Sequence, residues 1–245
     1  MMPCRYKRIA IAAFALLISA CASVPADQRV ESDPWESLNQ PLFAVNQGFD
    51  KALTKPLAKG YRAILPGPVR KVFTNFFTNL TTPRSIANNF LQGKPERGLS
   101  EVGRFLFNST VGIGGLFDVA TAAGMDEYRE DFGQTAAVWG VPDGPYVMLP
   151  LLGPQTLRDA ILLPVDIVFD PLYQYDNSSV RTKLYVVRLI ELRYRLLAAD
   201  KFLEESKDPY VTLRESYLQN RQFEIYDGDP PEDDDFFDEF LEEDE

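Results

Sequence analysis

The apolar positions of the chain recur mostly at helical spacing. In the clearest segment, apolar side chains follow one another at intervals of three and four residues, and polar or basic residues fill the opposite face. This stripe consists of Val69, Val72, Phe73, Phe76, Phe77 and Leu80. The periodicity predicts an amphipathic helix. Its aromatic side belongs either to the protein core or to a membrane interface, where a helix lies flat between apolar and charged surroundings.

Weaker stripes of the same period predict several other short and medium amphipathic helices. These helices are expected within residues 36–53, 83–93, 99–106, 184–197 and 208–217. The alternation of apolar and polar residues that marks a half-buried strand pair is not evident. After the first twenty residues, no run of apolar residues is long enough for a membrane-spanning helix. The pattern therefore predicts an all-α fold with a single compact domain.

Capping residues and prolines set the expected ends of these helices. Asn177 and Asp208 are side chains that favour helix N-termini. Thr156 and Asp159 have the spacing of a capping box before an apolar run. Within that run, Pro164 is expected to kink or interrupt the helix. Pro83 is expected to start a separate short helix.

Residues 111–125 (VGIGGLFDVATAAGM) fit none of these patterns. The segment is too short to span a bilayer and too rich in glycine for a regular core helix. Gly112, Gly114 and Gly115 predict a bend and a candidate hinge. The remaining apolar stretch faces lipid or neighbouring helices, or it is an ordinary buried turn and helix. Asp118, the one charged residue in the segment, is expected to have a partner.

The N-terminus is typical of a bacterial lipoprotein. A basic start and a short apolar run precede small residues and Cys21. Residues 1–20 therefore read as a signal peptide, with Cys21 as the acylated residue, and Ala22 favours sorting to the outer membrane. A signal peptide that is cut elsewhere, or an uncleaved anchor, is the alternative. Several acyl chains on one cysteine anchor a protein stably.

Charge divides the remaining chain into parts. The net charge of −11 belongs to the C-terminus, because residues 227–245 carry twelve acidic residues and no basic one. Such a tail is typically solvated and disordered. The predicted division is a lipidated tether at residues 21–33, a helical domain at 34–226 and an acidic tail at 227–245. Residues 51–110 carry ten Lys and Arg against two acidic residues, which favours contact with anionic lipid headgroups.

The chain offers little for catalysis. It contains no histidine, and its two cysteines belong to the signal peptide and the anchor. Catalytic triads with histidine, thiol nucleophiles and His-ligated zinc are excluded. The glycine segment lacks phosphate-loop spacing, and the acidic pI argues against nucleic acid. Acidic residues 126–131 are typical of a solvated loop. We therefore predict no enzyme, no cofactor and no metal site.

Several ordered stretches of the sequence resemble the MlaA (VacJ) family of outer-membrane lipoproteins. They include residues 33–40 (DPWESLNQ), 55–62 (KPLAKGYR), 88–93 (NNFLQG), 104–120 (RFLFNSTVGIGGLFDVA), 130–135 (EDFGQT), 156–159 (TLRD) and 214–221 (RESYLQNR). The resemblance covers most of the chain after Cys21, but not the acidic tail.

The resemblance implies a ring of helices around an amphipathic channel in the inner leaflet of the outer membrane. Such proteins associate with a trimeric porin and pass phospholipids misplaced in the outer leaflet to the periplasmic carrier MlaC, which maintains lipid asymmetry. Candidate polar residues of the channel are Asn75, Asn79 and Asp118. The alternative function is a non-transporting envelope scaffold that bridges a porin to other proteins. The expected location is the outer membrane, facing the periplasm and lipid-anchored.

Overall fold

The computed structural model describes residues 33–231. The predicted signal peptide, Cys21 and most of the acidic tail lie outside these residues. The helices are α2 (Glu36–Phe49), the π-helix η2 (Asp50–Thr54), α3 (Lys55–Ile64), α4 (Gly67–Leu91), α5 (Pro95–Thr110), α6 (Val119–Ala122), α7 (Phe132–Val138), α8 (Leu157–Val168), α9 (Ser178–Leu196), α10 (Asp200–Glu205) and α11 (Pro209–Ile225). The predicted all-α class is confirmed. Among the described helices, none is both long and apolar enough to cross a bilayer.

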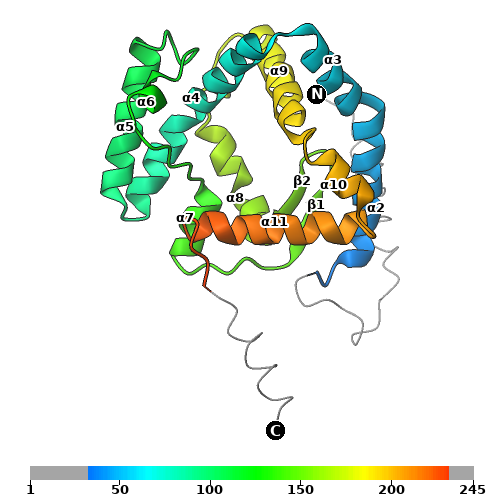
Figure 1. The fold of residues 1–245 in the computed structure, drawn as a ribbon. Helices are drawn as coiled ribbons and strands as arrows, with labels where there is room; N and C mark the ends of the chain where they lie inside the picture. Colours follow the sequence, from blue (N-terminus) through cyan, green and yellow to red (C-terminus); the bar gives the residue numbers. More distant parts are fainter. Residues whose placement is uncertain (1–32, 232–245) are drawn as a thin grey trace, which may run out of the picture.

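The elements are arranged as a ring (Figure 1). Helix α2 continues through η2 into α3, which packs on α9, and α9 contacts α4. Helix α4 then contacts α7, and α7 contacts α11. A β-hairpin of β1 (Tyr146–Leu149) and β2 (Gly153–Thr156) links α11 back to α2 and closes the circuit. Helix α5 lies outside the ring against α4, and α6 packs on α5 (Figure 1).

The hairpin is an element that the sequence pattern did not predict. Its strands pair antiparallel, with Tyr146 opposite Thr156. The other edge of β1 is paired by side chains of α2: Asn39 exchanges hydrogen bonds with the Tyr146 carbonyl and the Met148 amide, at 3.0 and 2.9 Å. Asn46 does the same for Leu149 and the turn beyond it. Two asparagines therefore take the place of a third strand.

Helix α4 corrects one prediction. It runs without interruption from residue 67 to residue 91, so a separate helix that starts at Pro83 is wrong. The side-chain hydroxyls of Thr81 and Thr82 donate to the carbonyl of Thr78, one turn before the proline. These bonds add donors to the Thr78 carbonyl; they do not replace the bond to the Asn79 carbonyl that Pro83 cannot make. Helix α8 likewise continues past Pro164 and is not interrupted there.

The predicted N-terminal caps at Thr156, Asn177 and Asp208 are confirmed. The side chain of Asn177 accepts from the Val180 amide, and Asp208 caps α11. Thr156 caps α8 by accepting from the Asp159 amide, although the Asp159 carboxylate binds arginines instead of completing the box. The full capping box of the described chain lies at α7, between Asp131 and Gln134.

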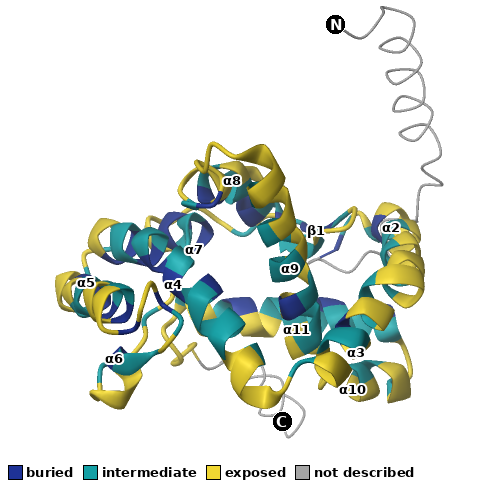
Figure 2. Cartoon of the chain, turned by 90° about the horizontal axis from the view of Figure 1, so that it is seen from above, coloured by how far each residue is buried: buried dark blue, intermediate teal, exposed yellow. Residues whose placement is uncertain are grey.

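The buried side chains are mostly polar and many large apolar side chains are exposed, which is the reverse of the usual arrangement in a water-soluble domain. Among residues 33–231, buried polar and charged residues outnumber buried apolar residues by more than two to one, while large apolar side chains are exposed on most helices. Figure 2 shows buried positions along α4, α7 and α11 and exposed ones on the outer sides of α5 and α6. A conventional apolar core of Tyr146, Met148 and Tyr210 is confined to the junction of α2, β1 and α11.

The predicted stripe of α4 follows this inversion. Phe77 is buried, Val69 is exposed, and the other four members of the stripe are half-buried. The polar side of the same helix is buried instead, with Asn79, Thr82, Ser85, Asn88 and Asn89. The aromatic stripe is therefore not the centre of a closed apolar core in this structure.

Candidate functional site

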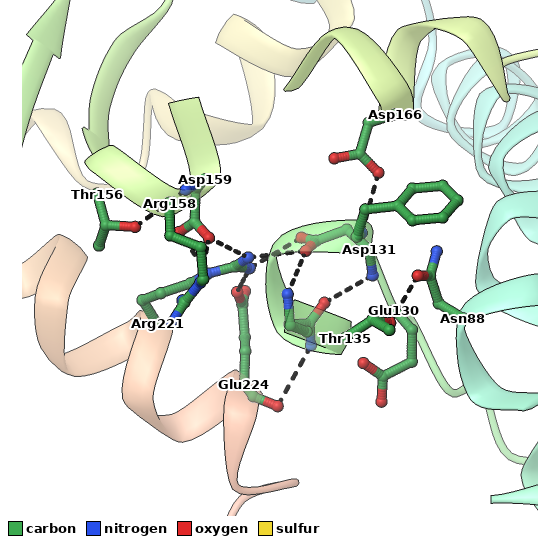
Figure 3. A network of polar contacts seen from close by, with 12 residues as sticks. Asn88, Glu130, Asp131, Thr135, Thr156, Arg158, Asp159, Asp166, Arg221 and Glu224 are labelled. Atoms are coloured by element: carbon green, nitrogen blue, oxygen red, sulfur yellow. Dashed lines mark hydrogen bonds and ion pairs between the residues drawn. The ribbon is translucent and has the colours of Figure 1, made fainter. Parts of the chain in front are cut away.

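The polar interior of the ring is centred on Arg221 of α11 (Figure 3). Its guanidinium makes two forked contacts: Nε and Nη2 donate to Asp159 of α8 at 2.8 and 3.0 Å, and Nη1 and Nη2 donate to Asp131 before α7 at 2.8 and 2.7 Å. Burial alone would raise the pKa of Asp131, but the hydrogen bonds from Arg221 hold it below its usual value. One buried cation thus joins three helices.

The close approach of these groups requires a glycine. A Cβ at Gly133 would collide with the Asp159 carboxylate and the Arg221 guanidinium. On the other side of α7, Asp166 of α8 accepts from the Phe132 amide at 3.2 Å and lies 3.5 Å from Arg84 of α4. Burial raises the pKa of Asp166 to about 6. The network therefore extends across α7 to α4.

A second chain of hydrogen bonds joins α4 to α7. The Thr135 hydroxyl donates to the Asn88 side chain at 2.6 Å, and Gln92 donates to Thr135 and to Glu130. Lys94 lies 3.3 Å from Glu130, which is buried. The prediction of a solvated loop at residues 126–131 is wrong at its C-terminal end, because Glu130 and Asp131 are bound inside this network.

Asp118 has partners, as expected. Its carboxylate accepts from Asn108 at 3.0 Å and from the Thr121 amide at 3.1 Å, and it caps α6. Arg104 of α5 lies 3.3 Å away. Burial would raise the pKa of Asp118, but its hydrogen bonds with Thr121 and Asn108 lower it. The Asp118 carboxylate is therefore paired with several donors and is not buried alone among apolar groups.

The predicted bend at the glycines is confirmed. Gly114 and Gly115 have φ of 68° and 85°, and a Cβ at Gly112 would collide with the carbonyls of Asn108 and Phe117. The bend packs tightly on α4, because a Cβ at Gly115 would lie 2.5 Å from that of Asn79. Whether the bend is a hinge stays a prediction.

The structure brings the three predicted channel residues to this one bend. Asn75 donates to the Leu116 carbonyl at 3.2 Å, and Asn79 donates to the Ser109 hydroxyl at 3.1 Å. Asp118 lies two residues after Leu116. All three side chains hold the bend against α4 and α5, and their role in a channel stays a prediction.

Two buried carboxylates that sequence reasoning missed join further elements of the ring, α9 to α4 and the start of α2 to α11. Glu191 of α9 accepts from Thr74 of α4 at 2.6 Å and pairs with Arg195. Asp33, immediately before α2, accepts from Asn39 at 2.8 Å and from Tyr210 and Arg214 of α11. The second site joins the start of the domain to its last helix.

The missed residues did leave a signal in the sequence. Asp131, Asp159 and Arg221, together with Arg104, Asn108 and Arg214, fall within the stretches that carry the family resemblance. Spacing alone could not reveal them, because Arg221 meets partners 62 and 90 residues away.

Two cavities open beside the network. A cavity of about 440 Å³ lies between the start of α5 and the end of α11, with Arg97, Glu127, Arg129 and Glu224 in its lining. A second, of about 250 Å³, lies between α7, the start of α8 and the end of α11, with Arg158 and Asp143 in its lining. No cluster of ligands suited to a metal occurs in residues 33–231.

Comparison with known proteins gives consistent matches. Residues 31–224 match the family model of the MlaA lipoprotein. The chain is 36% identical over 218 residues to the intermembrane phospholipid transport system lipoprotein MlaA of Escherichia coli (strain K12), which covers 87% of this chain and 86% of that protein. The Haemophilus influenzae protein of the same name is 30% identical over 222 residues, covering 87% and 88%.

A solved structure is also similar. It comes from work on the structural basis for maintenance of bacterial outer membrane lipid asymmetry. It is 38% identical in sequence, aligns with a TM-score of 0.71, and covers 80% of this chain and 100% of its own.

Proposed function

Because the chain belongs to the MlaA lipoprotein family, we propose that it is the outer-membrane lipoprotein of an intermembrane phospholipid transport system. It takes up phospholipid misplaced in the outer leaflet, passes it through an amphipathic channel in the helical ring and delivers it to a periplasmic carrier. The result is the maintenance of outer-membrane lipid asymmetry.

The observation that carries this proposal is the inverted burial. Large apolar side chains are exposed on α2, α3, α8 and α9, whereas amides, hydroxyls and paired charges fill the junctions between helices. An exposed apolar surface of this extent is typical of contact with a membrane or a partner. Desolvated polar groups are tolerated because they are paired.

The dimensions of the helices suit a protein that lies in one leaflet. The hydrocarbon core of a bilayer is about 30 Å thick, so one leaflet offers about half of that. Helices of ten to nineteen residues, such as α3 and α9, reach roughly 15–29 Å at 1.5 Å per residue. A ring of tilted helices of these lengths can therefore be embedded in one leaflet.

The anchor and partners complete the proposal. Acylated Cys21 lies twelve residues before Asp33, which limits the domain to about 40 Å from the lipid anchor even when the tether is fully extended. The domain faces the periplasm, where it passes lipid to the carrier MlaC, and it associates with a trimeric porin. The transfer is physical and requires no catalytic group, in agreement with a chain that lacks histidine.

Membrane contact can be tested without the anchor. In a mature chain with Cys21→Ala, Ile64→Glu places a charge at an apolar position that is 79% exposed on α3. We expect this variant to bind vesicles less than the Cys21→Ala parent does in flotation assays. Ser216→Glu, on the polar exposed side of α11, is the matched control and is expected to bind like the parent. Equal binding of both variants would contradict the proposed orientation.

Transport itself is tested by transfer. Vesicles that contain the acylated protein and labelled phospholipid are mixed with the soluble carrier, and carrier-bound lipid is measured over time. The proposal predicts faster transfer than from protein-free vesicles. Transfer at the protein-free rate would contradict the proposal, and binding of the same protein to a trimeric porin in a separate pull-down would then favour the scaffold function.

A further inference from the structure

Residues 51–71 carry positive charge that the described chain does not neutralise. The segment covers η2, α3 and the start of α4, and it contains six basic residues and no acidic one. Six exposed Lys and Arg side chains of residues 33–231 form no ion pair with a described carboxylate. Four of the six lie in this segment: Lys51, Lys59, Arg62 and Lys71.

The structure thereby narrows the positive region that the sequence indicated within residues 51–110. Beyond residue 71, the basic residues of that region are paired inside the protein. Arg84 lies beside Asp166, Lys94 and Arg97 hold Asp227, and Arg104 lies beside Asp118. The charge that remains available to a partner is therefore concentrated at α3 and its two ends.

Helix α3 exposes two different sides. Lys59 and Arg62 are three residues apart, so they share one side of the helix. Leu57 and Ile64 are seven residues apart, and at 3.6 residues per turn they share the opposite side. They are 44% and 79% exposed. Ala58, between these two sides, is fully buried, and α3 packs on α9. The contact with α9 therefore leaves both the apolar and the cationic side uncovered by the described chain.

This arrangement is typical of a helix at a membrane interface. In such a helix the apolar side enters the acyl region, while Lys and Arg on the polar side stay at the headgroups. The corner after α3 continues the pattern, because Pro66, Pro68 and Val69 are exposed immediately before Lys71. A neutral lipid surface would contact only the apolar side, whereas an anionic one complements both sides.

The acidic end of the chain does not cancel this charge. In Figure 1, α3 and the end of α11 lie on opposite sides of the ring. The twelve acidic residues of 227–245 follow the end of α11. At physiological ionic strength, exposed charges separated by more than about 8 Å are largely screened from each other. The local charge at α3 therefore decides which headgroups it attracts.

We propose that η2, α3 and the start of α4 form a docking surface for anionic phospholipids of the phosphatidylglycerol type. Leu57 and Ile64 contact the acyl chains, and Lys59, Arg62 and Lys71 bind the headgroup phosphates. The inference rests on the proposed function, because it names the lipid class that surrounds one side of the membrane-embedded ring. The acylated cysteine supplies attachment, and this surface selects the neighbouring headgroups.

The test compares two vesicle compositions. The mature chain with Cys21→Ala is mixed with vesicles of phosphatidylcholine alone, or of phosphatidylcholine with phosphatidylglycerol, and bound protein is measured by flotation. We expect a higher partition coefficient for the vesicles that contain phosphatidylglycerol. This preference should decrease as the salt concentration rises, because salt screens the attraction.

A double variant localises the preference. One Lys or Arg near an anionic surface changes the partition coefficient by about fivefold, so Lys59→Gln with Arg62→Gln is expected to lower binding to the anionic vesicles roughly tenfold. Binding to phosphatidylcholine alone should not change. The matched control is Lys183→Gln with Lys207→Gln, two exposed and unpaired lysines outside the surface among the described residues. It removes the same charge and should bind like the parent.

The outcomes separate this surface from the proposed function. Equal binding of the parent to both compositions overturns the anionic docking surface and leaves membrane contact intact. Equal losses in the double variant and its control also overturn it, because the effect then follows the total charge of the chain. Absence of binding to either vesicle would contradict the membrane contact on which the proposed function depends.

Discussion

The ring has two kinds of interior. Where α2, β1 and α11 meet, Tyr146, Met148 and Tyr210 pack as in a water-soluble domain, with T-shaped aromatic contacts between the tyrosines. Where α4, α7, α8 and α11 meet, the buried groups are amides, hydroxyls and charges around Arg221. The first region is stabilised by the removal of apolar surface from water, which is non-directional. The second depends on complete pairing of groups that are costly to bury alone.

This difference explains why the outside of the molecule can be apolar. Adjacent helices at the α4, α7 and α11 junctions adhere through polar side chains, so their apolar residues are not needed inside and remain available to lipid. The two regions should respond differently to substitution. Loss of one ionic partner leaves other charges buried, whereas loss of an apolar side chain leaves a cavity.

The largest effect is expected from Arg221→Met. The methionine keeps much of the side-chain volume but leaves Asp131 and Asp159 without their shared cation. Removal of one partner of a buried pair costs about 3–5 kcal/mol, so the thermal midpoint in detergent should fall sharply. Lys201→Met removes a cation that is 82% exposed and should change stability by less than about 0.5 kcal/mol. Comparable losses in the two variants would show that the network is not the main stabilising feature.

In the apolar region, Met148→Ala is expected to cost about 2–5 kcal/mol, because the side chain is almost fully buried and its removal leaves a cavity. Leu152→Ala, in the exposed turn of the same hairpin, removes a side chain that does not pack in the core. We expect little change for this control in urea unfolding. If Leu152→Ala is as destabilising as Met148→Ala, the hairpin turn is buried in a way that the structure does not show.

How much of this could be predicted from sequence depends on the range of the interactions. The stripe that begins at Val69 and the caps at Asn177 and Asp208 are local, and they specified α4, α9 and α11. The β-hairpin was missed because the outer edge of β1 is paired by a side chain distant in the sequence. Asn39 accepts from the Met148 amide, 109 residues away. The continuation of α4 past Pro83 was missed because helix propensity counts the lost backbone hydrogen bond and not the packing of this helix against α5 and α7.

The candidate site was predictable only in part. Asp118 and the glycines stand out because they break an apolar pattern, and the structure brings them together with Asn75 and Asn79. Arg221 and Glu191 do not stand out, since a charged residue on a helix is normally solvated. Their burial follows from closure of the ring, which no local pattern encodes.

The glycine bend offers a smaller and more local comparison. Gly114 and Gly115 both have positive φ, but only at Gly115 would a Cβ meet another residue, Asn79. Gly114→Ala should therefore lower the free energy of unfolding by only about 1–2 kcal/mol, the cost of a positive φ for a residue with a Cβ. Gly115→Ala should lower the free energy of unfolding by about 1–3 kcal/mol more, because its Cβ would collide with Asn79. Thermal unfolding of the two variants measures the difference, and equal losses would mean that the bend moves away from α4 at little cost.

The smallest effect concerns pH and a single buried carboxyl. Glu101 of α5 is 2% exposed and accepts from the Tyr128 amide at 2.6 Å, with Arg104, Glu127 and Arg129 as its charged neighbours. Burial raises the pKa of Glu101 to about 7. The folded state thus favours the protonated form, and this contribution to stability is complete below the unfolded pKa of about 4.5 and is lost as pH rises through 7.

Between pH 6 and 7.5, the parent chain should lose about 1 kcal/mol of stability through Glu101. Glu101→Gln mimics the protonated carboxyl and keeps an oxygen for the Tyr128 amide, so its stability should change less over the same interval. Unfolding midpoints at several pH values measure the two slopes. Parallel dependence of the two midpoints on pH would contradict the raised pKa of Glu101. It would mean that Arg104 stabilises the ionised carboxylate enough to offset its burial.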